Sequence, residues 1–520
     1  MSKSALPRRA LLAGAAATVI GWNTAGRSWA VTGPGTVTWP SREAGSGTEA
    51  GPGAEAGPGA EAGELAALPP LDGSVVADPD TLARFAGDFG HLVTAVPRAV
   101  LRPGSVRDVA TAVGFAHRHR IPVAMNGRSG TGSTAELESH SSYGQATAPG
   151  GLAIDARGLD RIVSVAPGRA VVEAGVTWAQ LTDAALARGW APPCLTDYLH
   201  LSVGGTLSVG GIGGAVQRYG LQVDTVESVD VVTGTGQLVT ASPTVNRELF
   251  DAVLAGGGQA GIIVRATLRL VRARERALVF SLFYDDLAAY LADQERLTAE
   301  QRFDLQVGEV VRNAAGTGWR YKAELVAHYD GTAVPDRAQL LHGLHHLAAE
   351  TTVVDQTARA YAFRVDGFAD YLKAAGLWGQ PKPWLSLFLP ASTTATFLRE
   401  AEALLTPEDL GAGLLLCYPF RTDRFTRPMA VMPAEPVGWH FDLLSFPAPG
   451  ADTAAALRRN RLLYDRAVAL GGKRYLIGAI PGLIRTDWRR HYGSRWPGAV
   501  AAKRRFDPAG ILTPGQGIHT

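Results

Sequence analysis

Cysteine is scarce in this 520-residue chain, and its placement excludes several kinds of site. The two cysteines, Cys194 and Cys417, lie far apart in the sequence. Neither belongs to a Cys-x-x-Cys motif or to the Cys/His spacing of a zinc site, so no metal is expected. Two buried free thiols are the simplest interpretation, and a disulfide between them is the alternative.

The sequence also lacks an excess of either positive or negative charge. The sequence holds 50 Lys and Arg against 48 Asp and Glu, which gives a formal net charge of +2. No long basic run or basic stripe is present to bind a phosphate backbone. We therefore expect no nucleic-acid partner.

Two common nucleotide-binding fingerprints are also missing. No Gly-x-Gly-x-x-Gly motif joins a strand to a helix with an acid about twenty residues later. No Gly-x-x-x-x-Gly-Lys-Ser/Thr motif occurs either. These absences argue against a nicotinamide-dependent dehydrogenase and against a P-loop enzyme.

The apolar run near the N-terminus, LLAGAAATVI, is too short and too rich in Ala and Gly to span a membrane stably. It follows the pair Arg8-Arg9 and precedes the small residues Ser28 and Ala30, which suit a signal peptidase. This order predicts a twin-arginine signal peptide over residues 1–30 and a secreted, periplasmic or otherwise extracytoplasmic protein. An ordinary secretory signal is the alternative, and no stable membrane insertion is expected.

Residues 31–75 are expected to form a disordered linker that is rich in Gly, Ala, Glu and Pro. Residues 43–64 within it repeat these four residue types. Such a composition cannot bury apolar surface, so we assign no structure to it.

The rest of the sequence predicts a large α+β protein. At 46% hydrophobic residues, the chain can bury the cores of two or three domains. From about residue 92, short strands and amphipathic helices alternate with glycine-rich crossings; Ser105, for example, suits the N-cap of a helix. Residues 76–275 are expected to form a first domain. Residues 276–475 are expected to form a second, with a sheet covered by helices on one face.

Glycine gathers in four stretches of the first domain: residues 127–132, 202–214, 233–236 and 255–263. Glycine lets backbone N–H groups approach a pyrophosphate closely. One such loop means little, since turns need glycine, but four in one domain favour a bound dinucleotide.

Two side chains near these stretches have open interpretations. His140, in the small-residue loop ESHSSYGQATAPGG, is either a solvated loop residue or a reactive imidazole. Asp197, just before a Gly-Gly loop, either caps a turn or acts as a base beside a cofactor.

Five motifs resolve part of this choice through a family resemblance: HSSYGQATAPGGLAID, TDYLHLSVGGTLSVGGIGG, LFDAVLAGGGQAGIIVRA, KPWLSLFLP and FDPAGILTPGQGI. Together they resemble cytokinin dehydrogenases, which belong to the vanillyl-alcohol-oxidase (PCMH-type) FAD-linked oxidoreductases. The resemblance is close over about residues 92–275 and 473–518 and weaker between them. It implies a two-part PCMH-type FAD-binding domain, a substrate domain with an antiparallel sheet covered by helices, and a return to the first domain over residues 476–520.

The resemblance also implies that His140 is bonded covalently to the 8α-methyl of FAD, since a neutral imidazole nitrogen is a nucleophile. The family places Gly-Arg-Gly directly before this histidine. Here Gly127-Arg128 is separated from His140 by an insert of roughly ten residues. We expect the insert to bulge outward and leave His140 in place. Displacement of His140, with FAD held non-covalently, is the alternative.

Further FAD contacts follow from the same resemblance. The residues implied are Ser141, Gln145, Gly127, Arg128, Thr196, Gly204, Gly205, Thr206, Ser208, Gly211, Gly214, Gly261, Ile262, Ile263, Tyr475 and Gln516.

By resemblance, Asp197 is the catalytic acid that accepts a hydrogen bond or proton from the side-chain amine of an N6-substituted adenine. Hydride then passes to flavin N5, and the imine hydrolyses to adenine and an aldehyde. Oxygen or a quinone would reoxidise the flavin.

The substrate pocket departs from the family at two positions. It would be formed by Trp384, Ser386, Val307 and Leu476. Val307 stands where the family has an acid, and Ser386 stands where it has Asn; Glu309 is close by but would point differently if the strand register holds. Two alternatives to a cytokinin substrate therefore stay open: oxidation of another small amine, alcohol or sugar, or a flavin-containing binding protein without turnover.

Overall fold

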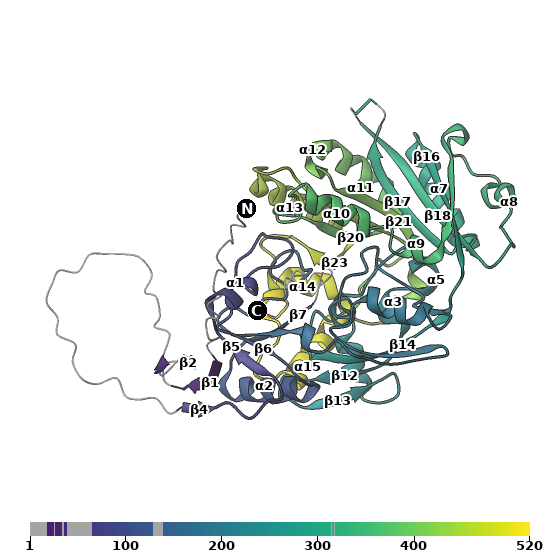
Figure 1. The fold of residues 1–520 in the computed structure, drawn as a ribbon. Helices are drawn as coiled ribbons and strands as arrows, with labels where there is room; N and C mark the ends of the chain where they lie inside the picture. The colour runs from purple at the N-terminus through teal and green to yellow at the C-terminus, as the bar shows by residue number, and fades with distance from the viewer. Residues whose placement is uncertain are drawn as a thin grey trace, which may run out of the picture.

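The computed structural model describes residues 18–24, 27–33, 36–38, 65–127, 139–313, 315–316 and 318–519. Three large sheets form its framework. Two of them lie in the lower half of Figure 1, and the third, an antiparallel sheet covered by helices, stands above them. This architecture confirms the α+β class.

The first sheet contains the parallel strands of the N-terminal half. Its central strands pair in the order β5 (Ser74–Val76), β6 (Ala99–Arg102), β8 (Leu152–Asp155) and β7 (Val123–Asn126). The helix α2 (Val106–His119) buries its apolar face in the core of this sheet. As predicted, Ser105 is its N-cap and accepts a hydrogen bond from the Asp108 N–H.

The N-terminal segment differs from expectation, because short strands extend this sheet beyond β5. They are β1 (Thr18–Asn23), β2 (Ser28–Gly33), β3 (Thr36–Thr38) and β4 (Leu65–Ala67). Trp22 and Trp29 are buried, and Trp29 stacks on Phe115 of α2 with ring centroids 5.9 Å apart. Parts of the expected signal peptide and linker are thus paired strands, which cover the edge of β5. Arg8-Arg9 and the repeat over residues 43–64 lie outside the described residues.

The second sheet is antiparallel and carries the glycine-rich loops. Its order is β13 (Leu238–Ala241), β12 (Val226–Val232), β14 (Ile262–Arg269), β10 (Arg169–Glu173) and β9 (Ile162–Ala166). The predicted TGTG turn joins β12 to β13. Shorter elements surround the sheet: α1 (Pro79–Arg84), α3 (Trp178–Leu186), β11 (Trp190–Ala191), α4 (Val203–Val209), α5 (Val216–Tyr219), α6 (Arg247–Val253) and β15 (Val271–Arg272).

The third sheet belongs to the part of the chain that the family resemblance assigns to substrate binding. Its order is β19 (Thr352–Thr357), β16 (Arg276–Tyr284), β18 (Trp319–Tyr329), β17 (Leu305–Arg312), β21 (Leu414–Arg421), β22 (Val437–Leu444), β20 (Leu385–Pro390) and β23 (Lys473–Gly478). Its outer face is covered by α7 (Leu287–Glu300), α11 (Ala391–Leu404) and α13 (Thr453–Ala469). The remaining helices of this domain are α8 (Arg337–Leu341), α9 (Ala358–Ala362), α10 (Asp366–Ala374) and α12 (Pro407–Leu410).

Alternation along the strands of this sheet separates its two faces. On β21, Leu415 and Cys417 pack with the covering helices, whereas Leu416 and Tyr418 belong to the core shared with the second sheet. A period of two is the rule for a strand with both faces buried against different partners. The inner face is therefore the one that meets the second sheet.

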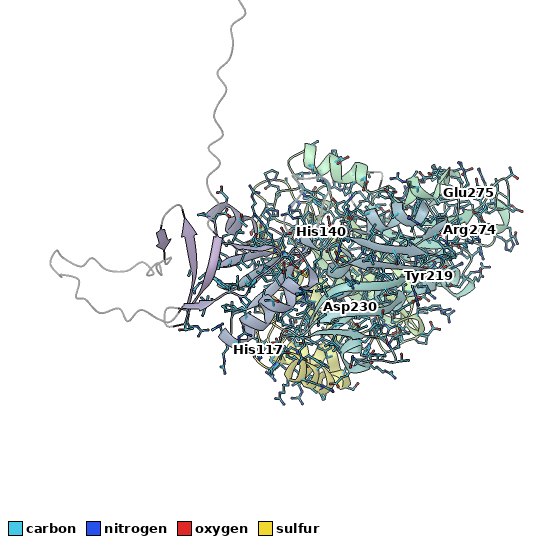
Figure 2. The ribbon with its side chains drawn as sticks, turned by 60° about the horizontal axis from the view of Figure 1, so that its bottom comes forward. His117, His140, Tyr219, Asp230, Arg274 and Glu275 are labelled. Atoms are coloured by element: carbon cyan, nitrogen blue, oxygen red, sulfur yellow. The ribbon has the colours of Figure 1, made fainter. Side chains whose placement is uncertain are left out.

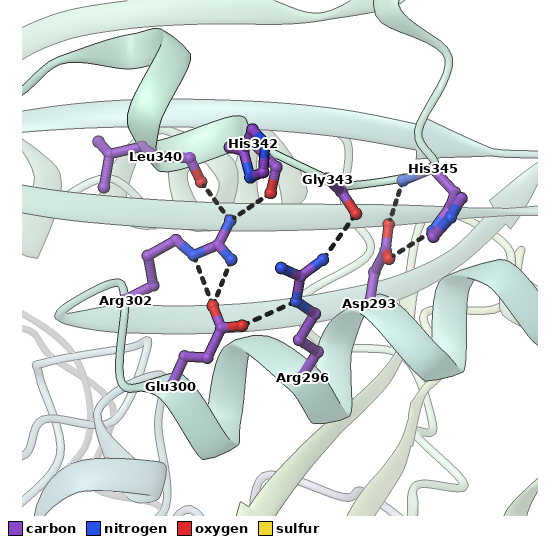
Figure 3. A network of polar contacts seen from close by, with 8 residues as sticks. All are labelled: Asp293, Arg296, Glu300, Arg302, Leu340, His342, Gly343 and His345. Atoms are coloured by element: carbon purple, nitrogen blue, oxygen red, sulfur yellow. Dashed lines mark hydrogen bonds and ion pairs between the residues drawn. The ribbon is translucent and has the colours of Figure 1, made fainter.

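A polar network fastens the segment after α8 to α7 on the outer side of the domain (Figure 3). Arg296 pairs with Glu300 over 2.7 Å and donates to the Gly343 carbonyl over 2.8 Å. Asp293 accepts hydrogen bonds from the backbone N–H and the Nδ1 of His345, over 2.6 and 2.9 Å.

The C-terminal part crosses back from the third sheet to the first two, as the lower position of α15 in Figure 1 shows. Residues 476–478 still belong to β23, which pairs with β20, so the crossing starts later than the expected residue 476. The chain then forms α14 (Arg485–Tyr492) and α15 (Trp496–Phe506), which contacts α6. Finally, Leu512 bridges to Val123 of β7 in parallel.

Three properties of the described residues bear on the initial expectations. Cys194 and Cys417 are both buried and not joined to each other. In the described part of the chain, no group of three or more His, Cys, Asp or Glu is placed to hold a metal ion. No helix among those residues has both the length and the hydropathy of a membrane-crossing segment.

Candidate active site

A cavity of about 350 Å³ lies where the two lower sheets meet the inner face of the third sheet. Most of the side chains singled out from the sequence line it, although they come from segments far apart in the chain. They are Gly127, His140, Ser141, Gln145, Thr196, Asp197, Gly204, Gly205, Thr206, Ser208, Gly261, Ile262, Ile263, Val307, Trp384, Tyr475, Leu476 and Gln516.

Three predicted residues lie outside the wall of this cavity. A Cβ on Gly211 would lie 2.0 Å from Oε1 of Gln222, and one on Gly214 would lie 2.9 Å from Cγ2 of Val307. The structure thus corrects the prediction for both glycines, which allow close packing rather than cofactor contact. Ser386 is fully buried behind the wall. Arg128 lies outside the described residues.

His140 is buried within the molecule (Figure 2) and lines the cavity. Its ring stacks on Phe89 with centroids 3.8 Å apart and an interplanar angle of 19°. Its Nδ1 has no hydrogen-bond partner among the described residues. Burial and, to a smaller extent, the charge of Lys382 together lower the pKa of His140 to about 3. The ring is therefore a neutral imidazole with a nucleophilic nitrogen.

Asp88 holds the loop that contains His140 in position. This role was not predicted from the sequence. Its carboxylate accepts hydrogen bonds from Ser141 Oγ over 2.7 Å, from the Gly144 N–H over 2.6 Å and from the Gly90 N–H over 3.2 Å. Burial raises the pKa of Asp88 to about 6, although these hydrogen bonds oppose the rise. No motif marks Asp88, since only its burial beside the loop shows the function.

Gln145 links the same loop to the substrate domain. Its Oε1 accepts hydrogen bonds from the Ser142 and Tyr143 N–H groups over 3.0 and 2.7 Å. Its Nε2 donates to the Gly478 carbonyl at the end of β23 over 2.8 Å. The His140 loop and the third sheet are therefore joined directly through Gln145.

The part of the cavity wall formed by Gln516, Gly127 and Gly205 suits a large polar ring system such as the isoalloxazine of FAD. Gln516 is buried, and its Oε1 has no hydrogen-bond partner among the described residues. A Cβ on either Gly127 or Gly205 would lie 2.8 Å from Ser202 Oγ, so these backbones approach as only glycine allows. Unsatisfied buried polar atoms beside a glycine-lined space are what a bound cofactor would satisfy.

Asp197 faces the cavity as one end of a chain of charges. Its carboxylate accepts a hydrogen bond from Arg364 over 2.5 Å. Arg364 also pairs with Glu324 over 3.2 Å, and Glu324 lies 3.7 Å from Lys322. Lys322 donates to Glu309 over 2.8 Å. Burial alone lowers the pKa of Lys322, but Glu309 and Glu324 outweigh it and raise the pKa above its ordinary value.

Val307 stands where the family has an acid, and a different acidic residue, Glu324, lies close to it on the neighbouring strand. In the ladder between β17 and β18, Val307 stands directly opposite Glu324. Both side chains line the cavity, as does Glu309. Sequence inspection missed Glu324 because cross-strand neighbours are visible only once the register is known.

Ser386 is the other residue that departs from the family pattern. Its side chain does not line the cavity, whereas that of its cross-strand neighbour Asp442 does. Ser386 on β20 stands opposite Asp442 on β22, and its hydroxyl donates to the Asp442 carboxyl. Asp442 lines the cavity together with His440, two residues earlier on the same strand. Neither side chain was singled out from the sequence.

Apolar side chains close the rest of the cavity. Trp384 is 7% exposed, and its indole N–H donates to the Ser445 carbonyl over 3.0 Å, which fixes the ring. The Tyr475 hydroxyl accepts a hydrogen bond from the Gly211 N–H over 2.8 Å. A planar substrate between these walls would be shielded from water.

An oxidoreductase that uses FAD is the class that fits this site, because one wall suits a flavin and a carboxylate faces the other. Two family models match the chain. The model described as "FAD binding domain" matches residues 97–242, and "Cytokinin dehydrogenase 1, FAD and cytokinin binding" matches residues 317–519.

Similar proteins extend the match to most of the chain. An "Uncharacterized oxidoreductase ORF5 in fasciation locus" of Rhodococcoides fascians is 38% identical over 440 residues, covering 84% of this chain and 96% of that protein. Cytokinin dehydrogenase 1 of Oryza sativa subsp. japonica is 36% identical over 501 residues, covering 86% and 91%. Cytokinin dehydrogenase 4 of Arabidopsis thaliana is 32% identical over 495 residues, covering 86% and 93%. The chain belongs to the cytokinin dehydrogenase family of FAD-dependent oxidoreductases.

Proposed function

We propose that the protein oxidatively cleaves the N6 side chain of isopentenyladenine-type cytokinins, with FAD as the oxidant. The observation that carries this proposal is the position of Asp197, in the cavity wall between the glycine-rich loops and the inner face of the substrate sheet. Relatives named cytokinin dehydrogenase and the cytokinin-binding family model over residues 317–519 support the substrate class.

In this proposal, bound FAD supplies a two-electron acceptor for the hydride that leaves the carbon next to the substrate nitrogen. Asp197 accepts the hydrogen bond or proton of that nitrogen, and Arg364 holds the carboxylate in place. Trp384 and Leu476 hold the planar substrate and exclude water until release. Water then hydrolyses the imine to adenine and an aldehyde.

His140 is proposed to carry FAD covalently. Its burial, its neutral ring and an Nδ1 without a hydrogen-bond partner among the described residues support this role, as does its place in the same cavity wall as Gly127 and Gln145. Neutrality matters because a protonated imidazole has no lone pair to offer.

The proposal also includes export by the twin-arginine route and reoxidation by oxygen or a quinone. The basis for export is the order of Arg8-Arg9, the short apolar run and Ala30.

A second candidate is oxidation of another small amine, alcohol or sugar on the same scaffold. Val307 favours it, because this apolar side chain replaces an acid that would otherwise bind an adenine. Asp442 and His440 add polar atoms to the wall that the cytokinin proposal leaves unused.

An anaerobic titration tests both candidates. The flavin absorption of the purified holoenzyme is recorded while isopentenyladenine is added, with a panel of amines, alcohols and sugars in parallel. Bleaching by isopentenyladenine alone supports the cytokinin proposal. Bleaching by another compound class supports the second candidate, and a fully loaded flavin that no compound bleaches contradicts both.

A further inference from the structure

Phe89 is the buried side chain on which His140 stacks. It is 1% exposed, and its ring centroid lies 3.8 Å from that of the imidazole. The two segments are also joined through their backbones. The Phe89 N–H donates to the Ser139 carbonyl over 2.9 Å, and the Gly90 N–H donates to the Ser141 carbonyl over 3.1 Å. His140 is therefore held through both of its neighbours in sequence and through its ring.

Lys382 holds Phe89 in turn, from the segment that precedes β20 of the third sheet. It is 0% exposed. Its Nζ donates to the Phe89 carbonyl over 2.7 Å and to the Gln380 carbonyl over 2.9 Å, and it lies 4.1 Å from the centroid of the Phe89 ring. Its backbone N–H donates to the Gly90 carbonyl over 2.7 Å. Because a desolvated cation is attracted to an aromatic ring, one lysine binds both the backbone and the ring of Phe89.

A lysine is a costly side chain for this position. Burying an ammonium group lowers stability unless its donors find acceptors, and a hydrophobic side chain of similar length would avoid that cost. Filling of space alone therefore does not account for Lys382. What the ammonium adds is a fixed place for the Phe89 ring, and with it for the His140 ring.

The effect of Lys382 on His140 has two conceivable sources, charge and geometry. Burial and the charge of Lys382 both lower the pKa of His140 to about 3, and burial is the larger cause. His140 therefore stays neutral near pH 7 without Lys382, so the charge adds little to its nucleophilicity. Geometry has the larger effect, because a displacement of about 1 Å in a reacting group can slow a reaction by about 10²-fold.

We propose that Lys382 is a positioning residue for the attachment of FAD to His140 and acts through the ring of Phe89. This inference rests on the covalent attachment proposed above. Attachment replaces the imidazole N–H bond and one C–H bond of the 8α-methyl by an N–C bond. It releases two protons and two electrons, which the proposed oxygen or quinone acceptor takes up. Because Lys382 precedes β20 of the third sheet and the His140 loop leads into β8 of the first, attachment is limited to molecules in which these two sheets have docked.

The test follows attachment over time in the full-length protein. Wild type and Lys382→Met, which keeps the chain length but removes the donors, are produced flavin-free under riboflavin limitation and mixed with FAD in air. The mass of samples denatured at intervals gives the attached fraction, and absorption of the native samples gives the total flavin. We expect equal total flavin but attachment at least about tenfold slower in Lys382→Met.

Further variants connect the effect to the stack. Phe89→Leu removes the ring and should be at least as slow as Lys382→Met, and the double variant should be no slower than Phe89→Leu. Lys382→Arg keeps a cation with donors and should attach FAD faster than Lys382→Met. Lys373→Met is the matched control, because Lys373 lies 4.7 Å from the ring centroid of the neighbouring Trp378 rather than on Phe89. It should attach FAD at the wild-type rate.

The outcomes separate this inference from the proposed function. Equal attachment rates in wild type and Lys382→Met overturn the positioning role and leave attachment at His140 intact. Recovery of the wild-type rate in Lys382→Met at pH 9 would assign the effect to charge, and a parallel loss of total flavin would assign it to folding; either result overturns the proposal. A wild-type rate in Phe89→Leu overturns it even if Lys382→Met does not fold. A wild type that releases all its flavin on denaturation removes the attachment itself, and this inference with it.

Discussion

Arg364 donates a hydrogen bond to Asp197 over 2.5 Å and thereby joins the segment between α9 and α10 to the loop that precedes α4. The two side chains are only 24% and 29% exposed, so the pair is partly shielded from water. Because Arg364 also pairs with Glu324 on β18, the carboxylate proposed for catalysis is fixed to the substrate sheet.

Replacing Asp197 tests whether that carboxylate takes part in the reaction. We expect Asp197→Asn to lower the rate of flavin reduction by about 10²- to 10⁴-fold, because the amide cannot accept a proton. Stopped-flow absorption with the reactive substrate measures this rate. Asp183→Asn is the matched control, since Asp183 accepts from Arg359 over 2.7 Å at the surface. Equal rates for the Asp197 variant and the wild type would remove Asp197 from the mechanism.

We expect Arg364 to affect the reaction rate by positioning the carboxylate of Asp197. Arg364→Lys keeps the charge but cannot reach Asp197 and Glu324 together, so we expect kcat to fall by about tenfold at unchanged flavin content. Steady-state kinetics and the flavin-to-protein absorbance ratio measure both quantities. Arg359→Lys serves as the control on the exposed pair with Asp183. An unchanged kcat would show that Asp197 needs no positioning by Arg364.

Covalent attachment at His140 has a direct chemical readout. After denaturation of the wild-type protein, FAD absorption should stay with the polypeptide and its mass should include one FAD. His140→Asn removes the nucleophilic nitrogen, so the flavin should be released into the supernatant. A His345→Ala protein, changed on the outer side of the substrate domain, should behave as the wild type. Free flavin from the denatured wild type would contradict attachment.

The buried carboxyl of Asp442 predicts a pH dependence of stability. In the unfolded chain it ionises near its ordinary pKa of 3.8, but in the folded protein only near about 8. Stability from this group is therefore present below about pH 4 and is lost as the pH rises to about 8. At about 1.4 kcal/mol per pKa unit, the loss amounts to several kcal/mol.

Urea unfolding of the wild type and Asp442→Asn at pH 5 and pH 8 measures this loss. The free energy of unfolding of the wild type should fall relative to the variant as the pH rises, since Asn does not ionise. His440, whose pKa burial lowers to about 3, is present in both proteins and cancels in the comparison. Parallel pH dependences would mean that Asp442 is ionised in the folded protein.

The N-terminus of the exported protein provides a further test. We expect the mature chain to begin at Val31, and the intact mass will show this. β1 meets β5 through the single pair Thr18–Val76, so its removal leaves the ladder from β5 to β7 complete. A mature chain that keeps Trp29 would show that the stacking on Phe115 belongs to the exported protein and that the signal cleavage prediction is wrong.

The sequence predicted the cofactor side of this site better than the substrate side. The glycine-rich stretches 202–214 and 255–263 and the His140 loop are continuous in sequence, so motifs reveal them, and parts of each line the cavity. The stretch 233–236, expected to act in the same way, only turns the chain between β12 and β13 and contributes no residue to the cavity wall. Glu324 and Asp442 escaped notice because they reach the cavity only through strand register, opposite Val307 and Ser386 respectively. A one-residue shift in either ladder would point them to the other face.

Glycines show a second limit of motif reasoning. Gly205 and Gly211 belong to one glycine-rich stretch, yet only Gly205 lines the cavity. Gly211 has a φ of +73° and lies against Gln222, so packing alone requires glycine there. A motif cannot separate these two reasons for the same residue type.

The segment between Gly127 and Ser139 has fixed ends. Gly127 follows directly from β7, and Ser139 bridges to Asp88 while its carbonyl accepts a hydrogen bond from the Phe89 N–H over 2.9 Å. His140 takes its position from the second of these anchors, not from the length of chain before it. We therefore expect codons gained or lost between the two anchors to leave His140 in place, so that an affinity tag could be inserted at this point.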